Sequence, residues 1–297
     1  MSRRSFRALL TQRQIVVSSR VCVGLDPVLE KLPEHIRASC ASSWQAVYHW
    51  MADIVDATAP YASMFKPQHA YWESFDGGIR ALRLLITHIH LKHPGIPVFM
   101  DCKRGDIDRT QEQYGVAHFL LEEADGMNYN GYMGSDTLKA LAKFGQEGRA
   151  LVGLGRTSNP SAWKIQDQQL VNGLRVWEQM ARYILDWSRD FGVIESAGIV
   201  MGAAHKDPLS QDRVYSDHLV RGREIYSDEL WNLIPGIGTQ KGFVEQTVLA
   251  ADRGPGSIAI NNSSAIIFAS NGRDFAEAAA NKAKEMRDEI NQYQRKG

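Results

Sequence analysis

The chain has few cysteines and no excess of charge of either sign. Its three cysteines are odd in number and lack metal-ligand spacing, and Cys22 and Cys102 lie in apolar runs that favour small core residues. Lys and Arg together number 34, as do Asp and Glu, so the formal net charge is zero. Because this balance creates no general field for polyanions or anionic lipids, we expect neither nucleic acid nor a membrane surface as a partner.

Long apolar runs are also missing, since no stretch of about 18 apolar residues predicts a membrane span. The first residues are basic but lack the apolar run of a secretory signal, and together with the cysteine usage they predict a cytoplasmic protein. No HExxH or similar histidine pair is present, and no GxSxG sequence either. We therefore expect no metal and no cofactor, and the nucleophilic serine of a hydrolase has no support.

In place of long runs, the sequence has eight short apolar runs separated by segments of helix length. The runs cover residues 21–25, 62–65, 97–100, 126–129, 150–154, 198–201, 231–234 and 257–260. Strands that alternate with helices predict parallel βαβ units, and eight of them predict an α/β fold of the (β/α)8 TIM-barrel type. A doubly wound open sheet is the alternative.

Nothing in the composition divides the series, because no linker, charge block or low-complexity segment interrupts it. We predict one barrel domain over residues 1–297. Its N-terminal helical segment, within residues 1–20, is expected to close the bottom of the barrel. A charged, Ala-rich helix is expected within residues 273–297.

The third run ends in alternating charges. Asp101 and Lys103 are two residues apart on a predicted strand, so they point to the same side, and Asp106 follows after a glycine. Lys66 ends the second run. Because the carboxyl ends of barrel strands carry the active site, these four residues predict a catalytic charge array. The alternative is a surface ion pair, with Lys66 reaching solvent from the barrel rim.

The loops after the seventh and eighth runs predict a phosphate site. Gly236, Gly238 and Gln240 follow the seventh run, while Ser264 and Ala265 follow the eighth. Barrel enzymes commonly bind phosphate there through backbone N–H groups and a helix N-terminus. A tight strand-to-helix turn is the alternative for the glycines.

Two further polar residues follow predicted strands. Ser158 places a hydroxyl over the barrel mouth, or else belongs to a turn with a helix cap. Asp26 either caps the first turn or accepts hydrogen bonds from sugar hydroxyls.

The combined motifs resemble those of the orotidine 5′-phosphate decarboxylase family, in its longer-chain branch, which occurs alone or as half of a bifunctional UMP synthase. The pattern Asp101-x-Lys103-x-x-Asp106-Ile107-x-x-Thr110 is shared with the wider superfamily. More specific motifs are Val-Gly-Leu-Asp-Pro at 23–27, Phe-Lys-Pro-Gln at 65–68, Tyr-Met-Gly-Ser-Asp at 132–136, Arg-Thr-Ser-Asn-Pro at 156–160 and Pro-Gly-Ile-Gly-x-Gln at 235–240. The resemblance covers roughly residues 20–270.

The resemblance implies decarboxylation of orotidine 5′-monophosphate to UMP in pyrimidine synthesis, without a cofactor. It implies that Lys103 donates a proton to C6 of the pyrimidine and that Asp101 lies against the substrate carboxylate. Lys66 and Asp26 would hold ribose hydroxyls. The remaining implied substrate contacts are Ile107, Thr110, Ser158, Gly238, Gln240, Ser264 and Ala265.

The resemblance also implies a homodimer, in which Asp106 and Thr110 reach into the partner's site, and a fused or associated orotate phosphoribosyltransferase. The chain departs from the family at Ala265, where an arginine usually grips the phosphate, and at Ala204 and Lys241, where Thr and Gly are expected. A metal-dependent sugar-phosphate decarboxylase or aldolase is one alternative. A variant with an impaired phosphate site that retains nucleotide binding is another.

Overall fold

Eight parallel strands form the barrel predicted from the sequence. The computed structural model describes residues 4–207, 210–237 and 243–294. The barrel strands are β1 (Val21–Leu25), β2 (Met64–Pro67), β3 (Phe99–Arg104), β4 (Gly126–Tyr129), β5 (Ala150–Arg156), β6 (Ala197–Met201), β9 (Trp231–Ile234) and β10 (Ile258–Asn262). They pair in the order β2-β1-β10-β9-β6-β5-β4-β3, and bridges from Phe65 to Val98 and from Gln68 to Asp101 close the barrel between β2 and β3.

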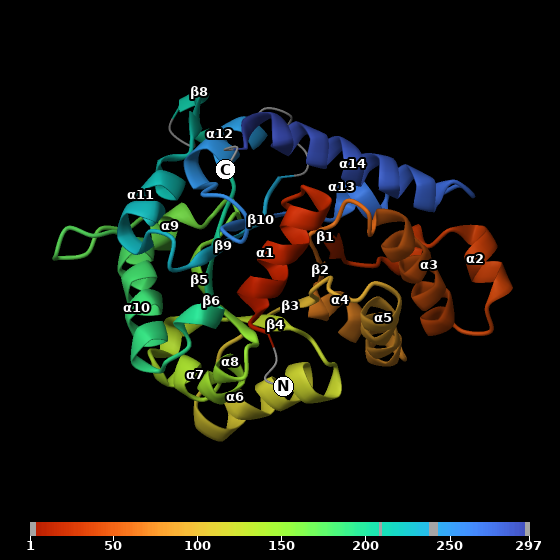
Figure 1. Ribbon diagram of the computed structural model, residues 1–297, viewed down its shortest axis with the longest axis horizontal. Helices are drawn as coiled ribbons and strands as arrows, with labels where there is room; N and C mark the ends of the chain where they lie inside the picture. The colour runs from red at the N-terminus through yellow and green to blue at the C-terminus, as the bar shows by residue number, and fades with distance from the viewer. Residues whose placement is uncertain (1–3, 208–209, 238–242, 295–297) are drawn as a thin grey trace.

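Helices surround the barrel (Figure 1). The longer ones are α1 (Phe6–Val17), α3 (Ser43–Thr58), α5 (Gly78–Lys92), α6 (Asp108–Gly115), α10 (Val176–Asp190), α11 (Asp217–Tyr226), α12 (Val244–Ala251) and α14 (Phe275–Tyr293). Shorter helical segments are η1 (Leu29–Lys31), α2 (Glu34–Ser39), α4 (His69–Glu73), η2 (Val116–Leu121), η3 (Gly131–Met133), α7 (Asp136–Lys139), α8 (Ala142–Gln146), α9 (Trp163–Gln166), η4 (Ile194–Ser196) and α13 (Ser264–Ile267). The two predicted terminal helices correspond to α1 and α14.

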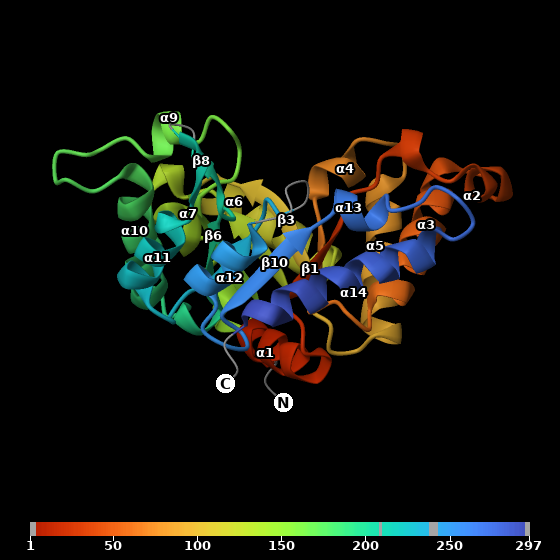
Figure 2. The same cartoon turned by 90° about the horizontal axis from the view of Figure 1, so that it is seen from above.

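The barrel interior is a packed apolar core that α1 closes at the bottom. Figure 2 shows α1 at the end of the barrel opposite α9 and β8. Phe6 stacks on Trp231 and meets Phe99 edge-on, both at the first residues of their strands. Gln14 donates to the carbonyl of Ile258. Helix α1 thus covers the end of the barrel where the strands begin, and the opposite end remains open.

The strand bounds differ from the sequence prediction where strands carry charge. The second strand was predicted to end at Phe65 and the third at Met100, but β2 includes Lys66 and β3 runs on to Arg104. Hydrophobicity marked only the apolar part of each strand, while strand pairing continues into the charged residues, of which Lys66 and Asp101 are also buried. The charged side chains thus come from the strands themselves, which position them more rigidly than loops would.

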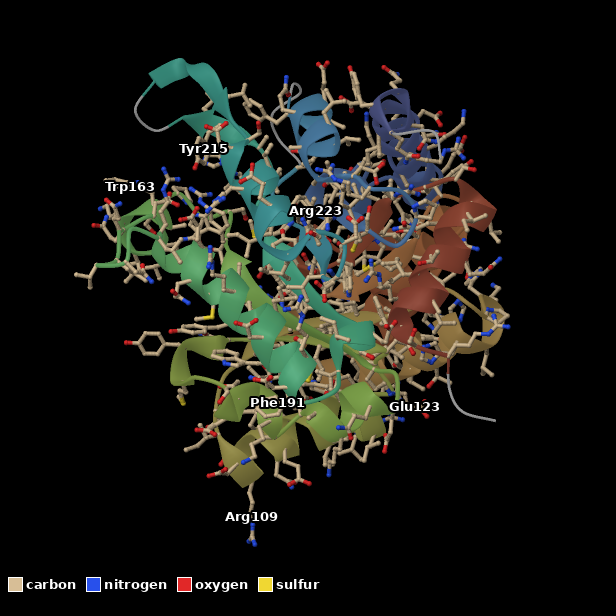
Figure 3. All side chains as sticks on the ribbon, turned by 60° about the vertical axis from the view of Figure 1, so that its left-hand side comes forward. Arg109, Glu123, Trp163, Phe191, Tyr215 and Arg223 are labelled. Carbon is tan, nitrogen blue, oxygen red and sulfur yellow. The ribbon has the colours of Figure 1, made fainter. Side chains whose placement is uncertain are left out.

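A small antiparallel pair, β7 (His205–Asp207) and β8 (Ser210–Tyr215), follows β6 and was not predicted. It has no long apolar run to mark it. Trp163 and Tyr215 lie near one edge of the molecule, at the end where α9 and β8 are found (Figures 2 and 3). Among the described residues, no helix is long and apolar enough to cross a membrane.

Candidate active site

Three of the four residues predicted as a charge array meet at the carboxyl ends of β2 and β3. Lys66 Nζ donates to Asp101 Oδ2 at 3.0 Å, and Lys103 Nζ donates to Asp101 Oδ1 at 2.5 Å. The Lys66 side chain is only 3% exposed, whereas that of Lys103 is 44% exposed. The carboxylate is therefore held between a buried ammonium and one that faces the open mouth of the barrel.

The proximity of opposite charges keeps these groups ionised despite burial. Burial alone would raise the pKa of Asp101, but the Lys66 and Lys103 ammonium groups and hydrogen bonds hold that pKa well below its usual range. Burial would likewise lower the pKa of Lys66, but Asp101 and Asp26 raise it above its ordinary value. The site thus presents fixed charges, which is the arrangement that stabilises developing charge in a reaction.

Asn128, on β4, joins this group and was not among the residues predicted for the site. Its Nδ2 donates to Asp101 Oδ1 at 2.6 Å, while its Oδ1 accepts from the backbone N–H groups of Lys103 at 2.6 Å and Cys102 at 2.9 Å. Lys103 has a φ of +48°, a left-handed conformation uncommon for a residue with a side chain. Asn128 therefore supports both the carboxylate and the unusual backbone that carries Lys103. Its place at the end of the fourth predicted strand was the available signal.

Asp26 lies at the same rim, directly after β1. Its Oδ1 accepts from the backbone N–H of Gln68 at 3.1 Å, just beyond β2. This contact fixes the carboxylate next to the strand end that bears Lys66, in keeping with its predicted place in the site.

Ser158 lies across the barrel mouth, after β5. It packs so closely on Gly202 and Gly236 that an added Cβ would lie about 3 Å from Ser158 atoms at either glycine, and Gly236 also has a φ of +103°. Ser158 lines a cavity of about 410 Å³ together with Arg156, Thr157, Asn159, Pro160, Trp163, Ala204, His205, Lys206, Gly236 and Phe243. This cavity is large enough for part of a nucleotide.

Arg156 has a structural role in the wall of this cavity. Its guanidinium makes a two-pronged contact with Asp167, with Nε at 2.9 Å and Nη2 at 2.8 Å from the two carboxylate oxygens. That pairing helps hold the pKa of Asp167 below its ordinary value against the opposing effect of burial. The contact fixes the segment after Ser158.

The loop after β10 contains Ser264 and Ala265 in the first turn of α13, where backbone N–H groups have no partner within the helix. The turn comes close to β1, because an added Cβ at Gly24 would lie 2.5 Å from that of Ser263. This contact explains the glycine in the motif at 23–27. Gly238, Gln240 and Lys241 lie outside the described residues.

Asp106 is not part of the charge cluster within one chain. Its Oδ1 accepts from the N–H of Ile107, and its own N–H donates to Gln111; in the described part of the chain no hydrogen bond or ion pair joins it to Lys103. Ile107 and Thr110 line a surface groove of about 810 Å³ beside α6 and α7. Arg109 projects outward from this surface (Figure 3). The predicted role of this segment in a partner's site remains a prediction.

A buried polar network lies next to the charge array and begins at Arg104, the residue that follows Lys103. Its other members are His69, His118 and Glu122. Glu122 accepts from His69 Nε2 at 2.9 Å and from His118 Nδ1 at 2.8 Å. Arg104 Nε donates to His118 Nε2 at 3.3 Å, and its Nη2 reaches Glu73 at 2.9 Å. Arginine can only donate, so His118 carries its proton on Nδ1 and is a neutral link between two charges. No motif in the sequence marks this network, because its residues are scattered along the chain without a shared spacing.

Fixed acidic and basic side chains at the carboxyl ends of the strands define a (β/α)8-barrel enzyme with an Asp–Lys charge array. More narrowly, the chain belongs to the Orotidine 5'-phosphate decarboxylase / HUMPS family, whose model matches residues 19–279. The chain is 37% identical over 290 residues to the orotidine 5'-phosphate decarboxylase of Azoarcus sp., covering 97% of this chain and 98% of that protein. It is 39% identical over 277 residues to that of Dechloromonas aromatica, covering 93% and 94%.

Solved structures agree with this assignment. The Leishmania donovani OMP decarboxylase superposes with a TM-score of 0.74 at 29% identity, covering 97% of this chain and 98% of that one. The L. donovani UMP synthase gives a TM-score of 0.76 at 29% identity, covering 97% of this chain but 57% of that longer one. The family expected from the motifs and the barrel fold are thus confirmed.

Proposed function

We propose that the chain decarboxylates orotidine 5′-monophosphate to UMP, and that the Lys66–Asp101–Lys103 cluster performs the chemistry. The observation that carries the proposal is the placement of a partly exposed ammonium, Lys103, against a buried carboxylate at the barrel mouth. Membership of the family and the full-length relatives support the reaction.

Loss of CO2 breaks the bond between C6 and the carboxyl carbon, and the electron pair stays on C6. That pair lies in the plane of the ring, where the π system cannot delocalise it. Lys103 Nζ, fixed by Asp101, stabilises this charge and then transfers its proton to C6. Lys103 is left neutral and regains a proton from water, which completes the balance.

The other predicted residues are proposed to bind the substrate away from C6. Asp26 and Lys66 hold ribose hydroxyls, and Ser158 contacts the pyrimidine. Gly238, Gln240, Ser264 and Ala265 surround the phosphate. Binding energy from the phosphate end would organise the site around the ring, which raises the rate when it is realised in the transition state.

A homodimer in the cytoplasm is proposed as the working form, with Asp106, Ile107 and Thr110 contributing to the partner's site. The exposed groove that Ile107 and Thr110 line is consistent with this arrangement. We also propose that the enzyme works with an orotate phosphoribosyltransferase, either associated or fused, because that reaction supplies its substrate.

A spectrophotometric assay with orotidine 5′-monophosphate tests the reaction directly. We expect turnover that survives extensive EDTA treatment, and a loss of several orders of magnitude in Lys103→Ala with the fold retained by circular dichroism. Near-normal turnover of Lys103→Ala would overturn the role of that lysine. Loss of activity on chelation, with rescue by magnesium, would instead indicate a metal-dependent sugar-phosphate enzyme.

A further inference from the structure

We propose that Asp56, His88 and His93, here called the outer histidine cluster, form a binding site for a divalent transition-metal ion of the Zn²⁺ type. The cluster lies between α3 and α5, two neighbouring helices of the outer layer (Figure 1). It is separate from the charge array, none of whose residues belongs to it. Sequence spacing gave no sign of it, because Asp56 lies on α3 whereas His88 lies on α5 and His93 directly follows α5.

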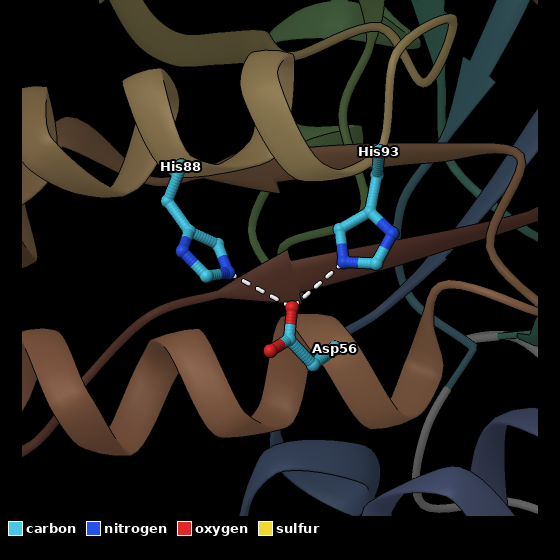
Figure 4. A group of neighbouring side chains, drawn as sticks. All are labelled: Asp56, His88 and His93. Carbon is cyan, nitrogen blue, oxygen red and sulfur yellow. Dashed lines mark hydrogen bonds and ion pairs between the residues drawn. The ribbon is translucent and has the colours of Figure 1, made fainter.

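The two imidazoles converge on one point. His88 Nε2 lies 2.8 Å and His93 Nε2 2.7 Å from the same atom, Asp56 Oδ1. Figure 4 shows both rings directed from the α5 side toward that oxygen. All three candidate ligand atoms lie within 4.8 Å of one another. Three side chains that offer two imidazole nitrogens and one carboxylate oxygen are a common donor set for zinc.

Small movements would convert this arrangement into a coordination site. Zinc binds imidazole nitrogen at about 2.0–2.1 Å and carboxylate oxygen at about 2.0–2.2 Å. Both Nε2 atoms already aim at the position of Oδ1, where each donates its proton to the carboxylate. An ion near that position binds both nitrogens once each neutral ring carries its proton on Nδ1 instead and the carboxylate swings back. A water molecule would complete the coordination.

The surroundings allow an ion to enter, but one cation competes with it. The three side chains are between 17% and 27% exposed, so the site opens to solvent without being a loose surface group. Lys92 Nζ contacts the second oxygen of Asp56, and the Lys92 side chain is 58% exposed. In this position the Lys92 ammonium repels a bound cation. Because its side chain is flexible and exposed, the ammonium can move away from Asp56 into solvent when an ion binds.

A second group of two histidines and a carboxylate, His69, His118 and Glu122, offers a useful contrast. It is fully buried, and the positively charged guanidinium of Arg104 already donates a hydrogen bond to His118 Nε2. An ion there would be enclosed beside a fixed cation. The outer histidine cluster is therefore the better metal site of the two.

A bound ion would join α3 to α5 and stabilise the folded chain. An ion that binds the folded state and not the unfolded one raises the free energy of unfolding by RT ln(1 + c/Kd), where c is the free ion concentration. Since the cluster is on the outer helices, catalysis should not require the ion. The proposal thus concerns stability and metal binding, and it does not depend on which substrate the barrel accepts.

Titration calorimetry of tag-free, metal-stripped protein with Zn²⁺ tests the site, and visible absorption of added Co²⁺ reports its coordination. We expect one strong site per chain and a rise in melting temperature with Zn²⁺. Loss of a residue that only hydrogen-bonds to a metal ligand typically weakens metal binding by roughly 10- to 100-fold. The double variant His88→Gln/His93→Gln removes two ligands and should weaken Zn²⁺ binding by more than this. Lys92→Gln should tighten binding, because it removes the competing charge.

His90→Gln is the matched control. His90 lies on the same helix and contacts a different carboxylate, that of Asp125, at 3.0 Å, so this variant should bind Zn²⁺ like the unaltered chain. Equal binding by the double variant and the unaltered chain would overturn the proposal. So would weaker binding by Lys92→Gln, or no thermal shift with Zn²⁺ in the unaltered chain.

Discussion

At the scale of single residues, the position of the Lys103 ammonium depends on a backbone conformation that its own sequence does not favour. The left-handed φ of +48° is costly for a residue with a Cβ, by about 1–3 kcal/mol. The Asn128 carbonyl offsets part of this cost by accepting from two successive N–H groups, those of Cys102 and Lys103. Asn128 thus supports both the strained backbone at Lys103 and the placement of the ammonium that we propose to be catalytic.

Asn128→Ala should lower kcat while leaving the fold intact. Loss of its hydrogen bonds to a carboxylate and to the Lys103 backbone costs about 1–3 kcal/mol, which corresponds to roughly a 5- to 150-fold loss of rate. Steady-state kinetics with orotidine 5′-monophosphate measure this loss. Asn130→Ala, two positions further on and outside the charge cluster, is the control and should retain most activity. Unchanged kcat in Asn128→Ala would contradict the supporting role.

Ala265→Arg should strengthen phosphate binding. An arginine in the first turn of α13 adds a charged donor to the backbone N–H groups already present, and a hydrogen bond to a charged group contributes about 1.5–3 kcal/mol. We expect a lower KM and a higher kcat/KM for orotidine 5′-monophosphate, both measured by steady-state kinetics. The uncharged variant Ala265→Gln is the control. If Lys241 already supplies the charge, Lys241→Ala should be impaired and Ala265→Arg should gain little. No change in either variant would place the phosphate elsewhere.

At the scale of elements, the ends of β2 and β3 are joined twice. The array links Lys66 to Lys103 through Asp101, and the buried network links His69 at the start of α4 to Arg104 at the end of β3. Since both networks connect the end of β3 to the segment at the end of β2, the buried network of Arg104 and His69 is expected to hold the charge array in its geometry.

The stability of the chain should fall at acid pH through Glu122. Burial would raise the pKa of this carboxyl, but hydrogen bonds from His118 and His69 lower it from 4.5 to about 2. A carboxyl whose pKa is lowered by folding stabilises the folded state above its unfolded pKa, and this contribution is lost as the pH falls toward its folded pKa. The window therefore lies between about pH 4.5 and pH 2.

Urea unfolding at about pH 5.5 and 3.5 should show a loss of stability about 1 kcal/mol greater in the unaltered chain than in Glu122→Gln. The variant should be less stable at neutral pH, because two histidines lose their charged partner. Glu123→Gln, at an exposed neighbouring position, is the control and should keep the full pH dependence. An equal slope in Glu122→Gln and the unaltered chain would contradict this account.

At the scale of the whole molecule, the barrel leaves one end open for chemistry and closes the other with α1 (Figure 2). The segment from Asp106 to Thr110 lies beside the open groove rather than in its own chain's charge cluster. The proposed dimer gives this segment a function that one chain alone does not.

Mixing Asp106→Ala chains with Lys103→Ala chains should restore activity if sites are shared. In a mixed dimer, one of the two sites receives both altered residues and the other receives neither. We therefore expect up to a quarter of the unaltered activity after random reassortment of subunits, measured against each variant alone. A mixture no more active than its components, with dimers confirmed by light scattering, would contradict shared sites.

The sequence by itself determined the barrel and the core of the site, because both depend on local patterns. Short apolar runs at regular intervals specify parallel strands, and residues two apart on a regular strand are expected on one face. Asp101 and Lys103 do meet, but Lys103 has a left-handed φ and the register of β3 shifts there, so the contact does not come from regular alternation. The meeting of Lys66 with Asp101 was predictable, since strand ends gather at one rim.

Tertiary structure alone decided contacts between residues with no shared periodicity. Asn128 and Asp101 are 27 positions apart, His69 and Glu122 are 53 apart, and Asp56 is 32 positions from His88 and 37 from His93. In the sequence, a polar residue on a helix or at a strand end looks the same whether its side chain faces water or contacts a partner residue. Only the packing of α3 on α5, and of β4 beside β3, fixes which atoms come within hydrogen-bonding distance.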